Sequence, residues 1–171
     1  MSSPSGDLGV DRSTPSSLPV RAIPHAAAFM KDKVFIDTNI MLYARDASEP
    51  QKQVLAAALL DELWENRGGR ISVQVLNEYF VNATRELEPG LSPLEAWEDM
   101  QALAAWQPLP LDMNVLARVF AVQSRYGLSW WDSLIVAAAE ACGCEQICSE
   151  DLSDGASYFG IKVVNPFRQS P

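Results

Sequence analysis

The chain has few of the side chains that most often act as nucleophiles, proton carriers or zinc ligands. It contains one histidine, His25, and three cysteines at positions 142, 144 and 148. The C-x-C-x3-C spacing lacks the C-x-x-C pair or nearby histidine that is typical of a structural zinc site. An odd number of cysteines crowded into one short segment does not form a disulfide framework either. The sequence therefore predicts reduced thiols in a cytoplasmic protein.

Long hydrophobic runs are also missing. No apolar segment reaches the roughly 18 residues that a membrane-spanning helix requires, and the first residues lack the basic segment and apolar core of a secretory signal. Residues 1–30 are rich in Ser, Pro and Ala without periodicity, so we expect a disordered tail there. The remainder, 31–168, has the composition and length of one globular domain without membrane contact.

Positive charge is scarce. Thirteen Lys and Arg residues face 22 Asp and Glu residues, which gives a net charge of −9. Such a balance argues against a nucleic-acid partner, because basic patches supply most of the non-specific affinity for a polyanion. Two routes around this objection exist. A divalent metal bound at an acidic site would neutralise charge and contact phosphate, or the partner is a basic protein.

The apolar periodicity predicts an α/β fold. Short strands are expected at 34–36, 70–72, 146–148 and 161–164, with an extended piece at 107–111. Helices are expected from 40 to 44, 51 to 65, 73 to 87, 92 to 105, 112 to 126 and 129 to 143. Alternating strands and helices indicate a short, mostly parallel β-sheet flanked by helices. Sites in such sheets form beyond the carboxyl ends of the strands.

Four acidic residues stand out at or near these positions. Asp37 directly follows the first strand, and Asp151 follows the strand at 146–148. Glu78 and Asp132 interrupt apolar surroundings within expected helices. Charged groups in such places are costly unless they are paired or bound to metal. Oxygen-only ligands favour Mg²⁺, with Mn²⁺ as a substitute.

Each acid also has a purely structural interpretation. Asp37 could cap the following helix, and Asp132 could complete a capping box with Ser129. Asp151 and Asp154 could be turn residues, and Glu78 could lie on a solvated face. Taken one at a time, these interpretations are the stronger ones.

Four segments in order resemble the motifs of PIN domains, in particular the toxin ribonucleases of VapC type. They are FIDTNI with Asp37, VLNEYF with Glu78, LSWWDSLIVAAA with Asp132, and CSEDLSDG followed by KVVNPF with Asp151. The resemblance covers about residues 33–167. It implies a three-layer α/β sandwich whose four acids are catalytic and bind the metal. Glu150 and Asp154 flank Asp151 and leave the choice of the fourth acid open.

The resemblance further implies Mg²⁺-dependent hydrolysis of phosphodiester bonds in RNA, a cognate antitoxin protein and a homodimer. Asn39 and Ser133 are candidates for orienting ligands through hydrogen bonds, or else a turn asparagine and a helix-start serine. Trp130 and Trp131 could stack an RNA base, although such aromatic residues more often make core or dimer contacts.

Two other functions compete with this one. An aspartyl-phosphate domain, whether a receiver or a phosphatase, would also place an aspartate where Asp37 lies. A receiver needs an acidic pair near its first strand, where only Asp32 is found, and the phosphatase needs an aspartate where this chain has Asn39. A PIN-like binding module without catalytic activity is the other alternative, and the presence of all four acids counts against it.

Overall fold

The structure is a computed structural model and describes residues 33–168. The tail expected at 1–30 lies outside the described residues. Within the described range, no helix is long and apolar enough to cross a membrane. The three cysteines are free thiols, as the sequence predicts.

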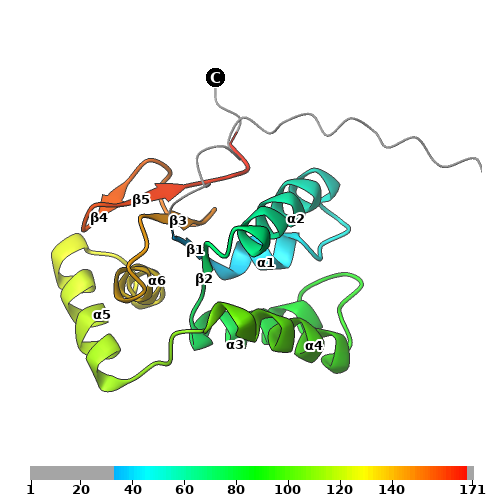
Figure 1. Cartoon of the computed structure of the whole chain (residues 1–171), viewed down its shortest axis with the longest axis horizontal. Helices are drawn as coiled ribbons and strands as arrows, with labels where there is room; N and C mark the ends of the chain where they lie inside the picture. The colour runs from blue at the N-terminus through cyan, green and yellow to red at the C-terminus, as the bar shows by residue number, and fades with distance from the viewer. Residues whose placement is uncertain (1–32, 169–171) are drawn as a thin grey trace, which may run out of the picture.

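Five strands form one sheet in the order β2-β1-β3-β5-β4 (Figure 1). They are β1 (Val34–Ile36), β2 (Gly69–Arg70), β3 (Gln146–Cys148), β4 (Ser157–Tyr158) and β5 (Ile161–Val164). The β1–β2, β1–β3 and β3–β5 pairs are parallel, and only β4 runs antiparallel, against β5. The predicted α/β class and mostly parallel sheet are confirmed. The carboxyl ends of the parallel strands β1, β2, β3 and β5 consequently lie at the same edge of the sheet.

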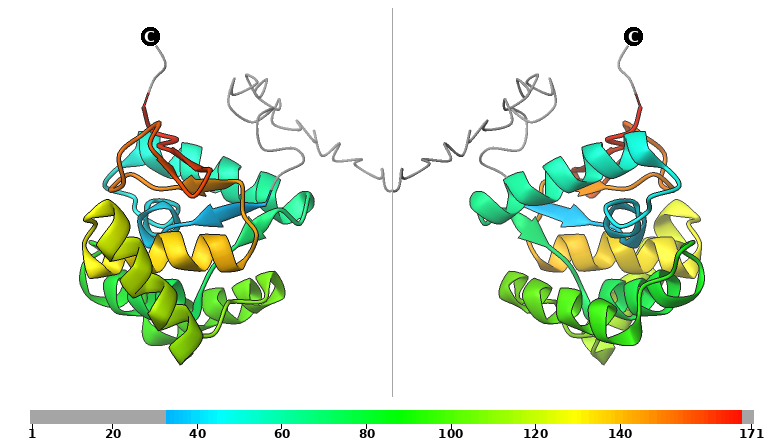
Figure 2. Two further views of the ribbon diagram at one scale, coloured as in Figure 1. Left: turned by 90° about the vertical axis from the view of Figure 1, so that its left-hand side faces the viewer. Right: turned by 90° about the vertical axis from the view of Figure 1, so that its right-hand side faces the viewer.

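Helices cover both faces of this sheet and complete a three-layer sandwich. They are α1 (Thr38–Tyr43), α2 (Pro50–Glu65), α3 (Val73–Arg85), α4 (Pro93–Leu103), α5 (Met113–Tyr126) and α6 (Trp130–Ala141), with a 3-10 turn, η2 (Ala104–Trp106). Figure 2 shows β1 running between α2 on one side and α6 on the other. The seven residues 133–139 of α6 are all buried, so this helix forms the centre of the core.

Side-chain caps set the starts of several helices. Ser72, Asp112 and Ser129 each accept a hydrogen bond from a backbone N–H of the first turn, which satisfies a donor that the helix itself leaves unpaired. Ser92 and Glu95 form a reciprocal capping box at the start of α4. These polar contacts explain why the sequence places the helix starts within a residue or two.

Two details of the sheet differ from the prediction. The strand expected at 70–72 contains only Gly69 and Arg70, and Ser72 instead pairs with Leu109 in an isolated parallel bridge. Strand β4 was not predicted, because two residues are too few to show an alternating pattern. Both differences lie at the margins of the sheet and leave its central strands unchanged.

Candidate active site

Asp37 is buried at the carboxyl end of β1, where it also caps α1. Its carboxylate is 7% exposed and accepts hydrogen bonds from the Thr38 backbone N–H (2.7 Å) and the Ser149 hydroxyl (2.6 Å). Burial raises its pKa to about 6, and the nearby charges of Asp151 and Glu78 add to the rise, while the two hydrogen bonds oppose it. The fold therefore holds a carboxylate where its negative charge is unfavourable.

Asn39 connects Asp37 to Asp151. Its side-chain N–H₂ group lies 3.2 Å from an Asp37 carboxylate oxygen and 3.1 Å from one of Asp151. The Asn39 side-chain oxygen accepts a hydrogen bond from the Glu150 backbone N–H at 3.3 Å. One amide thus aligns two acids that are more than a hundred residues apart in the sequence. This is the orienting contact that the sequence analysis considered for Asn39.

Glu78 reaches the same region from α3, which packs against α1. One carboxylate oxygen accepts a hydrogen bond from the Thr38 hydroxyl at 3.0 Å, and the other accepts one from the Gln74 side-chain amide at 2.8 Å. Thr38 touches both acids, since its backbone binds Asp37 and its hydroxyl binds Glu78. Asp37 is therefore within electrostatic reach of two other predicted acids, Asp151 and Glu78.

Among the hydrogen bonds of residues 33–168, Asp132 shares no partner with these three acids. It lies in the first turn of α6, where its carboxylate accepts a hydrogen bond from the Ser129 hydroxyl at 2.8 Å. Its backbone N–H donates to the same hydroxyl at 3.0 Å. Burial raises the pKa of Tyr158, and the charge of Asp132 adds to this rise. Ser129 thus caps α6, but the bond from the Ser129 backbone N–H to the Asp132 carboxylate that would complete a capping box is not formed.

The arrangement can be compared with what a divalent cation needs. Within residues 33–168, no three ligating side chains already lie close enough together to enclose an ion. The donor chemistry nevertheless fits Mg²⁺ or Mn²⁺, because every candidate ligand is a carboxylate or amide oxygen. The unfavourable charge of Asp37 fits as well, since a bound cation would offset both its burial and its repulsion from Asp151 and Glu78.

The neighbours of Asp151 are engaged elsewhere. Glu150 accepts a hydrogen bond from the Lys52 ammonium group at 2.6 Å. Asp154 accepts one from the Asn165 backbone N–H at 2.9 Å. Of these three acids, only Asp151 shares a hydrogen-bond donor with Asp37. The geometry thus favours Asp151 as the fourth acid.

Three residues that orient the acids were not predicted from the sequence: Ser149, Thr38 and Gln74. Besides binding Asp37, the buried Ser149 hydroxyl accepts hydrogen bonds from the backbone N–H groups of the two residues that follow Glu150, each at 3.1 Å. A signal for Ser149 was present, because it follows β3 just as Asp37 follows β1, and the two strands pair in register. Thr38 lies in the FIDTNI motif, next to Asp37. Gln74 could have been found only from its position one helical turn before Glu78.

The other sequence candidates lie at the start of α6. Ser133 is fully buried, and its hydroxyl has no hydrogen-bond partner among the described residues. Trp130 and Trp131 are 37% and 62% exposed, so neither is a core residue. Their exposure leaves them available for contact with a ligand or another chain.

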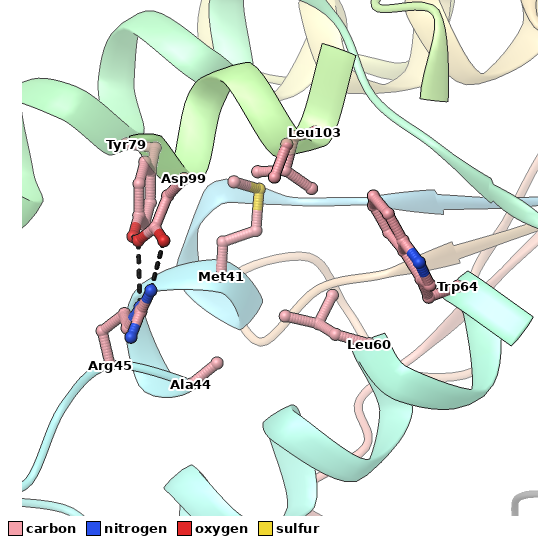
Figure 3. A pocket seen from close by; sticks show the side chains of 9 residues that line it. Met41, Ala44, Arg45, Leu60, Trp64, Tyr79, Asp99 and Leu103 are labelled. Atoms are coloured by element: carbon pink, nitrogen blue, oxygen red, sulfur yellow. Dashed lines mark hydrogen bonds and ion pairs between the residues drawn. The ribbon is translucent and has the colours of Figure 1, made fainter. Parts of the chain in front are cut away.

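A hollow of about 190 Å³ lies between α1, α2, α3 and α4 and has a polar cluster at one end (Figure 3). There the Arg45 guanidinium binds the Asp99 carboxylate through two nitrogens, and the Tyr79 hydroxyl donates to the same carboxylate. This cluster links α1, α3 and α4. It therefore fixes the two helices that present Asp37 and Glu78 to each other.

Comparison with known proteins assigns the fold to a family. No curated protein matches the chain. A solved structure described as a toxin–antitoxin complex from Klebsiella pneumoniae is similar, with a TM-score of 0.57 and 20% sequence identity over 80% of this chain and 100% of that chain. Residues 34–153, which include β1, Asp37, Glu78, Asp132 and Asp151, match the PIN domain family, whose members are generally nucleases. The chain therefore belongs to the PIN domain family.

Proposed function

We propose that this protein is a metal-dependent endoribonuclease that acts as the toxin of a toxin–antitoxin pair. The observation that carries the proposal is the buried Asp37 carboxylate, which the fold holds beside two other acids despite the cost of its charge. A costly charge that is retained at the carboxyl edge of a parallel sheet is typical of a functional site. Membership of a family of nucleases supports the same conclusion.

Four acids would hold the metal. Asp37 and Asp151 would be direct ligands, Asp132 would join them by giving up its hydrogen bond to Ser129, and Glu78 would orient a water or hold a second ion. Mg²⁺ is the expected cofactor and Mn²⁺ the expected substitute. When bound, the metal would supply an activated water and a positive charge that offsets the developing charge on phosphate.

The remaining polar residues prepare this site. Asn39 sets the spacing between Asp37 and Asp151 by donating to both. Ser149 orients Asp37 and at the same time orders the backbone of the loop that carries Asp151. Because Asn39 and Ser149 are fixed by the fold, Asp37 and Asp151 need little reorganisation when RNA arrives, which favours electrostatic catalysis.

The neighbouring helix α3 supports Glu78 in the same way. The Gln74 amide and the Thr38 hydroxyl each hold one of its two oxygens, so the carboxylate has a fixed orientation. A carboxylate held in this manner can accept a proton from a water at a defined position. This would be the role of Glu78 in the hydrolysis of the phosphodiester bond.

A protein partner follows from the charge. The net charge of −9 repels free RNA but attracts a cationic segment. A small antitoxin could insert an Arg or Lys among the four acids in place of metal, and an Arg fork fits paired carboxylates well. The similarity to a structure from a toxin–antitoxin complex supports this part of the proposal. We also expect the toxin to form a homodimer.

RNA cleavage by the purified protein tests the proposed function. Wild type should cut single-stranded RNA in Mg²⁺ or Mn²⁺ and lose this activity in a chelator. Asp37→Asn should reduce the rate by at least about a hundredfold, whereas Asp61→Asn, at an exposed position of α2, should cleave like wild type. RNA binding without cleavage by the wild type would instead support an inactive PIN-like binding module.

A further inference from the structure

A hollow of about 450 Å³ adjoins the candidate active site. It lies between α3 and the first turns of α6, with Leu111 from the segment before α5 at its side. Glu78 belongs both to this hollow and to the group of acids. Trp131 lines it from α6 and directly precedes Asp132 in the sequence. A molecule bound here would therefore be adjacent to the acids and not remote from them.

Several of the apolar side chains that line the hollow are unusually exposed. The Trp131 indole is 62% exposed, Val81 is 45% exposed and Leu111 is 38% exposed. Large apolar side chains that remain in contact with water next to one another indicate a binding surface. A flat indole in such a place fits a flat, aromatic ligand, because stacking buries both faces in contact.

The surface of the hollow is almost wholly apolar, so the two asparagines among its lining residues would meet a bound ligand only at the ligand's edge. Asn77 and Asn82 line it from α3, and their side-chain amides have no hydrogen-bond partner among the described residues. By contrast, the Asn39 amide is engaged by both of its polar atoms. Each free amide offers a donor and an acceptor side by side, which is the pattern that reads the edge of a nucleobase.

The charge of the hollow decides which part of an RNA strand it fits. Of the residues that line it, Glu78 alone is charged, and it is acidic. A phosphate would be repelled there, whereas a neutral base would not be. The remaining contacts, one aromatic face and two amides, are those by which proteins recognise single-stranded RNA bases.

We infer that this hollow is a nucleobase subsite, which binds an unpaired RNA base next to the phosphate that is cut. The base stacks on Trp131, and Asn77 and Asn82 bind its edge. The inference rests on the proposed function, since it takes RNA as the substrate. A base bound here would give the enzyme a preference for certain bases at the cut. Its contacts would also hold RNA on an acidic protein without basic side chains.

The test measures cleavage of a random single-stranded RNA octamer library and the sequences of the product ends. Trp131→Ala should raise KM by about tenfold, the size of effect that one stacked base produces, with kcat changed much less. Trp131→Phe should keep most of the wild-type KM. Trp97→Ala is the matched control, because Trp97 is also exposed (51%) but lies on α4 outside the hollow.

The asparagines are tested by the base preference. The Asn77→Ala/Asn82→Ala double variant should lose the preference that wild type shows at the product ends while still cutting the library. Wild-type cleavage with an unchanged KM in Trp131→Ala would overturn the subsite and leave the proposed function intact. A changed sedimentation coefficient without any effect on KM would assign the hollow to contact between two copies of the chain, which also overturns it. Absence of cleavage by the wild type would contradict the proposed function itself.

Discussion

Replacing Asp37 with asparagine should stabilise the metal-free protein. In the folded state the Asp37 carboxylate is shielded from water and faces the charges of Asp151 and Glu78, which together hold its pKa near 6. An amide of the same shape removes that charge without leaving a cavity. A residue that we expect to be essential for function therefore lowers stability when no metal is bound, as functional sites often do.

The magnitude follows from the shift of the pKa. A rise from 3.8 to about 6 corresponds to a cost of about 3 kcal/mol at a pH well above 6, since one pKa unit is about 1.4 kcal/mol. Asparagine has one oxygen fewer to accept the hydrogen bonds of Ser149, Thr38 and Asn39, which costs about 1 kcal/mol. The difference between these two effects is a net stabilisation of Asp37→Asn by about 2 kcal/mol at pH 7.5.

The sign of the pH dependence is also determined. As the pH falls through 6, Asp37 takes up a proton in the folded protein before it does so in the unfolded chain, whose pKa stays near 3.8. The cost of the charge in wild type therefore shrinks to about half its full size at pH 5 and disappears below pH 3.8. The advantage of Asp37→Asn should shrink with it, to less than about 1 kcal/mol at pH 5.

Urea denaturation in the presence of EDTA, at pH 7.5 and pH 5, measures both effects. Asp61→Asn, in an exposed position of α2, serves as the control and should change stability by less than about 0.5 kcal/mol at either pH. The reasoning is refuted if Asp37→Asn is destabilised at pH 7.5, or if its difference from wild type is the same at the two pH values.

Two further substitutions test the surroundings of the site. Gly69→Ala should lower the free energy of unfolding by about 1–3 kcal/mol in urea, because its Cβ would lie 2.5 Å from the Trp106 ring. Lys52→Met should cost less than about 1 kcal/mol, since its ion pair with Glu150 is partly exposed. It should nevertheless weaken Mn²⁺ binding in calorimetry, because Glu150 anchors the loop that carries Asp151; unchanged affinity would show that the loop needs no such anchor.

Much of the fold could be predicted because the signals are local. Ser72, Ser92, Asp112 and Ser129 mark helix starts through contacts within three residues, and those predictions agree with the structure to within a residue or two. The parallel sheet follows from the alternation of strands and helices. The edge strand β4 could not be predicted, because its two residues are ordered by pairing with β5 and not by a pattern of their own.

The site was less predictable, because its contacts join distant parts of the chain. That Asp37 and Asp151 lie close together follows from the rule for strand ends, and the sequence suggested it. The Asn39 amide bridges the two acids through hydrogen bonds. These bonds depend on the exact register of β1 and β3, which the sequence does not reveal. The contact between Asp132 and the Ser129 hydroxyl, by contrast, joins residues three apart in the sequence, and the pattern of a helix start already suggested it.

Calorimetric titration of Mn²⁺ into the metal-free wild type, Asp37→Asn and Asp61→Asn measures whether Asp37 binds a cation. The fold keeps an unfavourable carboxylate at Asp37, and we propose that it does so in order to bind a divalent ion. We expect saturable binding to wild type and Asp61→Asn, and an affinity at least about tenfold lower for Asp37→Asn. Equal Mn²⁺ affinity in wild type and Asp37→Asn would contradict this proposal.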